Sequence, residues 1–164
     1  MQKKYYIVLA GVLGLIGLDQ ITKKIFESIL ADGKIVVIKG FFQFNLSYND
    51  GAAWGILSGN MLVFYMITLV AFGLFYILLK DVNFQTKKLY SIAVILLIAG
   101  AIGNFIDRMV YKEVIDFIDF IIFGYDFPIF NIADICLVIG MIMFGIDVLL
   151  EDALHGKFKN RRSV

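Results

Sequence analysis

The sequence predicts an α-helical polytopic membrane protein with four transmembrane helices and a small extracytoplasmic antiparallel β-sheet. Of the 164 residues, 60% are hydrophobic and only 18% are charged, and the mean hydropathy is +0.85. Soluble chains are about 45 to 50% apolar and about a quarter charged. Four segments approach the roughly 20 apolar residues that cross a hydrocarbon core. These observations exclude a disordered chain, a nucleic-acid-binding protein and an ordinary soluble domain.

The four predicted spans form a single membrane-embedded domain over residues 1–164. They lie at about residues 5–25, 61–79, 89–106 and 130–150, with longer outer loops at 26–60 and 107–129. An even number of crossings places both termini on one side. Nine of the 15 lysines and arginines lie in the termini or in the short connection between spans two and three: Lys3, Lys4, Lys80, Lys87, Lys88, Lys157, Lys159, Arg161 and Arg162. Because basic residues accumulate in cytoplasmic segments, we expect cytoplasmic termini and extracytoplasmic longer loops.

The first span also has features of a secretory signal peptide, since Lys3 and Lys4 precede an apolar run. No small-residue cleavage pattern follows, and the segment 17–20, Gly-Leu-Asp-Gln, is a poor cleavage site. We therefore expect the first span to be retained.

Cysteine and histidine are too scarce for metal or disulfide chemistry. Cys136 is the single cysteine and His155 the single histidine, so an intramolecular disulfide, a cysteine zinc cluster and a histidine-rich metal site are excluded. We expect no metal and no cofactor. Cys136 is expected to be an apolar filler. The chemistry must come from carboxylates, amides, hydroxyls or lysines.

The first outer loop predicts two strands. Apolar residues alternate with amide or hydroxyl residues from Phe42 to Asn49, which is typical of a half-buried strand. The turn residues 49–51, Asn-Asp-Gly, end that strand. Residues 34–39 predict a partner strand, and we expect the small sheet to lie at the outer membrane surface. Trp54 and the tyrosines near span ends are expected to anchor at the interface.

The second outer loop, residues 108–127, fits two structures. Lys112, Asp116 and Asp119 would share one face of a helix, whereas Val114, Asp116 and Ile118 would share one face of a strand. Periodicity leaves both open. A strand would point Asp116 and Asp119 to opposite faces, so that only one of them could join a site.

Asp116 and Asp134 are the candidate acid and base. Asp134 begins the fourth span near its outer end and Asp116 lies in the preceding outer loop, so both are expected at the same height. Two carboxylates in a partly dry pocket share a proton, and the pair can then activate a water and protonate a carbonyl oxygen. In the alternative interpretation, which spacing alone favours, Asp134 caps the fourth helix and Asp116 is a solvated loop acid.

Further polar residues lie at the ends of the first, third and fourth spans: Asp19, Lys23, Asn104, Asp107, Arg108 and Asn131. Those of the third span are expected at the same outer level as the two acids, and Asn131 on the same helical face as Asp134, whereas structural pairing is the expected role of Asp19 and Lys23. Asp19 and Lys23 are four residues apart and can pair on one helical face. Asn104 and Arg108 also share a face, where they would either position a polar substrate or hold the sheet to the helices. The small residues at 100–103 are expected to pack closely against another helix.

Five short blocks of the sequence resemble, in order, the motif blocks of the lipoprotein signal peptidases. They are residues 19–23 (Asp-Gln-Ile-Thr-Lys), 49–54 (Asn-Asp-Gly-Ala-Ala-Trp), 103–108 (Gly-Asn-Phe-Ile-Asp-Arg), 114–117 (Val-Ile-Asp-Phe) and 130–134 (Phe-Asn-Ile-Ala-Asp). The resemblance extends from the first span to the fourth. Trp54 stands where the family often has phenylalanine, and residues 99–101 replace a more glycine-rich stretch.

The resemblance implies an aspartic endopeptidase of the bacterial cytoplasmic membrane, with its active site near the outer face. Such enzymes remove the signal peptide from diacylglyceryl-modified prolipoproteins, cutting just before the lipid-bearing cysteine. Asp116 and Asp134 would be the catalytic pair. Motif positions that imply support or substrate positioning are Asp19, Lys23, Asn49, Gly51, Asn104, Asp107, Arg108, Asn131 and Ala133. The implied partners are lipid-modified prolipoproteins and membrane lipid, not nucleic acid, and one chain is expected to act as a monomer.

Two other functions are compatible with membrane carboxylates. In a proton-coupled transporter or channel subunit, Asp19 and Asp134 would relay protons. Four short spans without an evident inverted repeat argue against that function. A non-catalytic assembly factor would tolerate neutral substitutions at both acids.

Overall fold

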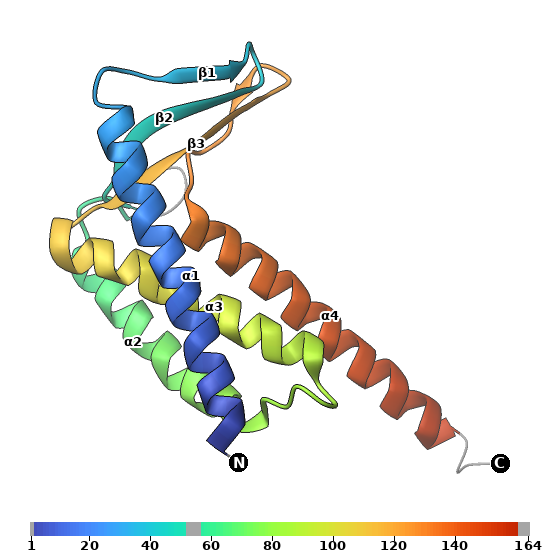
Figure 1. Ribbon diagram of the computed structural model, residues 1–164. Helices are drawn as coiled ribbons and strands as arrows, with labels where there is room; N and C mark the ends of the chain where they lie inside the picture. The colour runs from blue at the N-terminus through green and yellow to red at the C-terminus, as the bar shows by residue number, and fades with distance from the viewer. Residues whose placement is uncertain (1, 52–56, 161–164) are drawn as a thin grey trace.

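The computed structural model describes residues 2–51 and 57–160, so Trp54 lies outside the described residues. Within them, four helices are long and apolar enough to cross a membrane. The elements are α1 (Gln2–Ile29), β1 (Ile35–Ile38), β2 (Phe42–Asn49), α2 (Met61–Leu78), the 3-10 helix η2 (Leu79–Asp81), α3 (Lys88–Tyr111), β3 (Val114–Ile122), β4 (Tyr125–Asp126) and α4 (Ile132–Asn160). The predicted fold class, four helices and a small antiparallel sheet, is confirmed (Figure 1).

Helix α3 is the centre of the helical bundle, because it contacts α1, α2 and α4. Its buried residues Val94 and Ile98 pack in one core with Val8 and Val12 of α1. The small residues just past the middle of α3 let α4 approach closely, as predicted. A Cβ atom at Gly100 would collide with the backbone oxygen of Ala133 in α4.

The sheet has the strand order β1-β2-β3-β4 and all of its pairings are antiparallel. The second outer loop therefore contains a strand, which decides between the two structures that periodicity left open. The sheet lies at the end of the bundle where α1 finishes and α4 begins (Figure 1). Phe26 of α1 holds it there, with ring centroids 4.4 Å from Phe44 of β2 and 4.3 Å from Phe117 of β3.

The opposite end of the bundle gathers basic residues from segments far apart in the sequence. Lys4 donates a hydrogen bond to the backbone oxygen of Lys80 at 2.9 Å, and Lys87 pairs with Glu151 at 3.2 Å. The start of α1 and the far end of α4 both lie at this end (Figure 1). The sheet and the basic end are thus separated by the length of the helices.

Candidate active site

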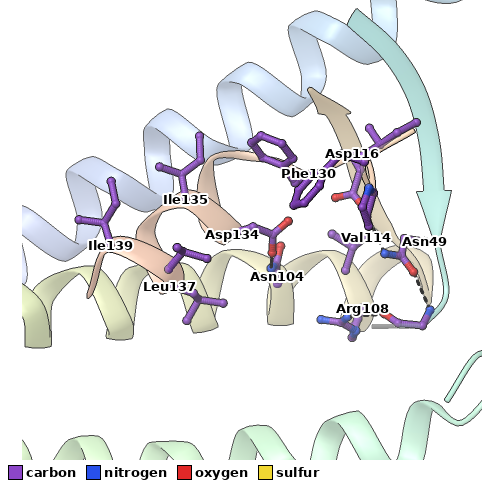
Figure 2. A pocket seen from close by; sticks show the side chains of 15 residues that line it. Asn49, Asn104, Arg108, Val114, Asp116, Phe130, Asp134, Ile135, Leu137 and Ile139 are labelled. Atoms are coloured by element: carbon purple, nitrogen blue, oxygen red, sulfur yellow. Dashed lines mark hydrogen bonds between the residues drawn. The ribbon is translucent and has the colours of Figure 1, made fainter. Parts of the chain in front are cut away.

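Asp116 and Asp134 line the same pocket, which has a volume of about 490 Å³. It lies between the sheet, the C-terminal half of α3 and the first turns of α4 (Figure 2). Its other polar lining residues are Asn49, Asn104 and Arg108, and the remaining wall is largely apolar. The structure therefore brings two acids from separate elements to one largely apolar cavity.

Asp116 is almost fully buried near the start of β3, with 2% of its surface exposed. One carboxylate oxygen accepts a hydrogen bond from the Asn131 amide at 2.6 Å and the other from the Asn49 amide at 3.2 Å. Burial and, to a smaller extent, the nearby charge of Asp134 raise the pKa of Asp116 from 3.8 to about 7, against the opposing effect of the two amides. Asp116 therefore exchanges a proton near neutral pH.

Asp134 lies in the first turn of α4 and forms a reciprocal cap with Asn131. The Asn131 side-chain oxygen accepts the backbone N–H of Asp134 at 3.0 Å, and the Asp134 carboxylate accepts the backbone N–H of Asn131 at 3.2 Å. The second Asp134 oxygen accepts the Asn104 amide at 2.7 Å. The capping role considered from the sequence is therefore present, and the same carboxylate also faces the pocket.

Asn131 joins the two acids although it does not line the pocket. Besides capping α4, its buried amide donates to Asp116 and to the Asn104 side-chain oxygen, the latter at 3.1 Å. One amide thus contacts both Asp116 and the residue that holds Asp134. Displacement of Asn131 would disturb both carboxylates together.

Lys23 lies behind these amides and is 1% exposed. Its ammonium group contacts Asp19 at 2.8 Å and Asp107 at 2.7 Å, and it donates to the Asn104 side-chain oxygen at 3.1 Å. The predicted pairing of Asp19 with Lys23 is present, and Asp107 joins it from α3. A buried cation is thereby fully paired, as burial of charge requires.

Asp19 ties α1 to the start of α4. Its carboxylate accepts the backbone N–H of Ala133 at 2.9 Å, one of the helix-terminal donors without an intrahelical partner. A Cβ atom at Gly103 would lie 2.7 Å from that carboxylate and 3.1 Å from the Ala133 Cβ. Gly103 and Ala133 are therefore small because α1, α3 and α4 converge here.

Arg108 connects the C-terminal end of α3 to the turn after β2. Its guanidinium donates to the backbone oxygen of Gly51 at 3.0 Å and lies 4.4 Å over the Phe64 ring. The Asn49 side-chain oxygen accepts the Gly51 N–H at 2.9 Å, which shapes the turn. Asn49, which also donates to Asp116, is thereby fixed relative to α3.

Two contributors to the site were not predicted. Gln20 donates to Asp107 at 2.8 Å and to the Gly103 backbone oxygen at 3.3 Å. A polar amide inside an apolar span could have indicated that Gln20 faces other polar groups. Phe64 gave no such signal, since an aromatic residue is ordinary in a span.

Asp119 points away from the site, as the strand alternative predicted. Its carboxylate accepts the Gln43 amide at 2.7 Å and the Asn45 amide at 3.2 Å, and it does not line the pocket that contains Asp116. Across residues 2–51 and 57–160, no group of three or more histidine, cysteine, aspartate or glutamate side chains is placed to hold a metal ion. The site's own chemistry is that of two carboxyls, their amides and one arginine.

The fold and the pocket together define a polytopic membrane protein with a paired-carboxyl site beneath a small sheet. The family model described as signal peptidase (SPase) II matches residues 11–150. The chain belongs to this family, the lipoprotein signal peptidases. The resemblance carried by the five sequence blocks is thereby confirmed.

Named relatives and solved structures agree along nearly the whole chain. The lipoprotein signal peptidase of Staphylococcus haemolyticus (strain JCSC1435) is 47% identical over 159 residues, covering 93% of this chain and 98% of that protein. That of Staphylococcus aureus (strain Newman) is 47% identical over 164 residues, covering 97% and 98%. A bacterial membrane enzyme structure at 2.3 Å resolution superposes with a TM-score of 0.74 at 43% identity, covering 90% of this chain and 89% of that one.

Proposed function

We propose that this chain is a membrane aspartic endopeptidase that removes the signal peptide from diacylglyceryl-modified prolipoproteins, cutting just before the lipid-bearing cysteine. Family membership supports the peptidase activity and the class of substrate. The observation that carries the aspartic mechanism is the shared pocket of Asp116 and Asp134, joined through Asn131. We also propose that one chain acts as a monomer.

In the proposed reaction, the pair holds one proton at the start. The ionised carboxylate removes a proton from a water, whose oxygen attacks the scissile carbonyl carbon, while the protonated carboxyl donates to the carbonyl oxygen. When the tetrahedral intermediate collapses, the carbon–nitrogen bond breaks and the carboxyl that took the water's proton donates it to the leaving amine. The other carboxylate takes a proton from a hydroxyl of the intermediate as the carbonyl re-forms, so the pair again holds one proton. The raised pKa of Asp116, about 7, supports a pair that shares a proton at neutral pH.

The apolar wall of the pocket supports access from the bilayer. Val138 and Ile139 of α4 line the pocket and are 59% and 44% exposed. A signal helix or acyl chain could therefore reach the acids from the hydrocarbon without passing through water. We propose that the sheet end faces outward and both termini are cytoplasmic, which the gathering of Lys4, Lys80 and Lys87 at the opposite end supports.

The deciding experiment compares cleavage of a lipid-modified precursor by wild type, Asp116→Asn and Asp134→Asn in detergent, without an ion gradient. We expect each variant to lose cleavage by at least about 10³-fold, since removing a member of such a unit abolishes its chemistry. Asp119→Asn is the matched control, because it changes a buried acid in the same strand that points away from the pocket. It should retain cleavage.

Full activity of a folded Asp116→Asn or Asp134→Asn protein would overturn the aspartic mechanism. Loss of cleavage in Asp119→Asn alone would relocate the site to the other face of the sheet. A transporter would not process the precursor in detergent, and an assembly factor would tolerate all three substitutions.

A further inference from the structure

The sheet carries an apolar edge that the helices leave uncovered. All four residues of β1 are exposed aliphatics, with Ile35 at 43% and Val36, Val37 and Ile38 each at 52%. Phe123, in the turn between β3 and β4, is fully exposed. We call β1 together with Phe123 the apolar edge.

This pattern differs from that of a strand in water. A half-solvated strand alternates apolar and polar residues, whereas β1 is apolar on both faces. In addition, β1 is an outer strand of the sheet and has one neighbour, β2, among the described strands. An exposed aliphatic edge in water would promote association with other strands. The edge therefore suits an environment that is itself apolar.

The two parts of the apolar edge, β1 and Phe123, reach the same end of the sheet. The Ile121 backbone N–H donates to the Phe41 backbone oxygen at 2.8 Å, so the β1–β2 turn sits beside the end of β3 and the turn that holds Phe123. Both turns project from the same end of the sheet, away from the attachment on α1 (Figure 1). Lys34 and Lys39 flank β1, in the positions where a cation can reach headgroups while the aliphatic residues between them insert.

We propose that the apolar edge inserts into the outer leaflet beside the helices, with lipid as its partner. The sheet sits at the end of four membrane-spanning helices, so lipid is the apolar phase continuous with it. Insertion fixes β2 and β3, which carry Asn49 and Asp116, at the bilayer surface. The edge thus sets the depth of the pocket, whether or not the two acids perform the proposed cleavage.

Single tryptophans report this insertion directly. In a Trp54→Phe background, which removes the only native tryptophan, we would introduce Val37→Trp or Phe123→Trp and reconstitute the full chain in vesicles of brominated phosphatidylcholine. Leu69→Trp, on the exposed face of α2, is the lipid-facing control, and Gln85→Trp, in the exposed turn after η2, is the aqueous control. We expect brominated lipid to quench both edge tryptophans at least about half as strongly as the Leu69 position, and acrylamide to quench the Gln85 position most.

A further variant tests whether the turn anchors the strand. Phe123 has a φ of 52°, a conformation that asparagine adopts readily, so Phe123→Asn removes the ring without straining the turn. In that variant, lipid quenching of Val37→Trp should fall. Edge tryptophans quenched by acrylamide and not by lipid would overturn the proposal. Protection from both quenchers would also overturn it, since a protein surface would then cover the edge.

Discussion

At the scale of single residues, Lys23 determines which way two buried amides point. An ammonium group only donates, so the Asn104 oxygen faces Lys23 and the Asn104 amide nitrogen faces Asp134. The same oxygen accepts the Asn131 amide, whose nitrogen also donates to Asp116. A cation that does not line the pocket therefore sets the hydrogen bonds received by both acids.

Substituting Lys23 should separate stability from catalysis. Lys23→Met leaves Asp19 and Asp107 buried without their cation and should cost about 3–5 kcal/mol of stability. Adding Asp107→Asn removes one of those charges. The double variant should therefore recover part of the unfolding temperature that Lys23→Met loses in detergent. Cleavage should stay low in the double variant, because Asn104 is then free to reverse its amide. A wild-type kcat in the double variant would contradict this role.

Asp116 also predicts a pH dependence of the proposed cleavage. Its pKa is raised to about 7, so the pair keeps its shared proton below that pH and loses it above. Because one carboxyl must be protonated, kcat/KM should fall about tenfold per pH unit well above 7. Profiles from pH 5 to 9 would measure this, with Asp119→Asn expected to follow wild type. A kcat/KM that rises above pH 7 would contradict the proposal that the pair must hold one proton at the start.

At the scale of elements, the start of α4 is the point where the bundle is most constrained. Its backbone donors are met by the cap from Asn131 and by Asp19 from α1. Gly103 of α3 lies against both Asp19 and Ala133. The helix that carries Asp134 is thus positioned from three directions, and its first turn has little room to move.

Gly103→Ala should therefore destabilise the fold. The added methyl group would lie 2.7 Å from an Asp19 oxygen that Lys23 already holds, so a cost of about 1–3 kcal/mol follows from overpacking. Gly73→Ala in α2 is the control, because nothing lies within 4 Å of its Cβ position and alanine favours a helix. Thermal unfolding in detergent should show a lower midpoint only for Gly103→Ala. Equal unfolding midpoints for the two variants would contradict the close contact of Gly103 with Asp19.

The sequence predicted the elements better than their ends or contacts. Helix α3 continues to Tyr111, beyond the predicted end of the third span at 106, because Asp107 is paired inside the protein and Arg108 is anchored to Gly51. From sequence alone, the charges of Asp107 and Arg108 indicate the end of a span. Strand β3 was ambiguous because both of its faces are largely buried, which removes the alternation that identifies a strand.

The site was predictable as a set of residues but not as a network. The motif blocks identified Asp19, Lys23 and Asn104 as site residues. Spacing along the chain, however, predicts only which residues share a face of one helix, not which residues of different helices make contact. The contacts of Lys23 with Asp107 and Asn104 join α1 to α3, and such pairings depend on how the helices pack. For the same reason, the dual role of Asp134 as cap and pocket acid required the three-dimensional arrangement.

At the scale of the whole molecule, the sheet and the basic end lie at opposite ends of the helices. Cysteine labelling tests the proposed orientation in a Cys136→Ser background. Asp32→Cys, in the exposed turn before β1, should react with a membrane-impermeant maleimide on intact cells or protoplasts. Gln85→Cys, in the turn after η2, should react only after permeabilisation. The reverse pattern would place the pocket at the inner face.

The apolar wall of the pocket, which includes the exposed residues Val138 and Ile139, has a consequence for competition. If ligands arrive through the bilayer, occupancy depends on their mole fraction among the lipids and not on their molarity in the surrounding buffer. Doubling the amount of vesicle at a fixed total amount of an apolar competitor would then dilute it and weaken inhibition, although its concentration in the sample stays unchanged.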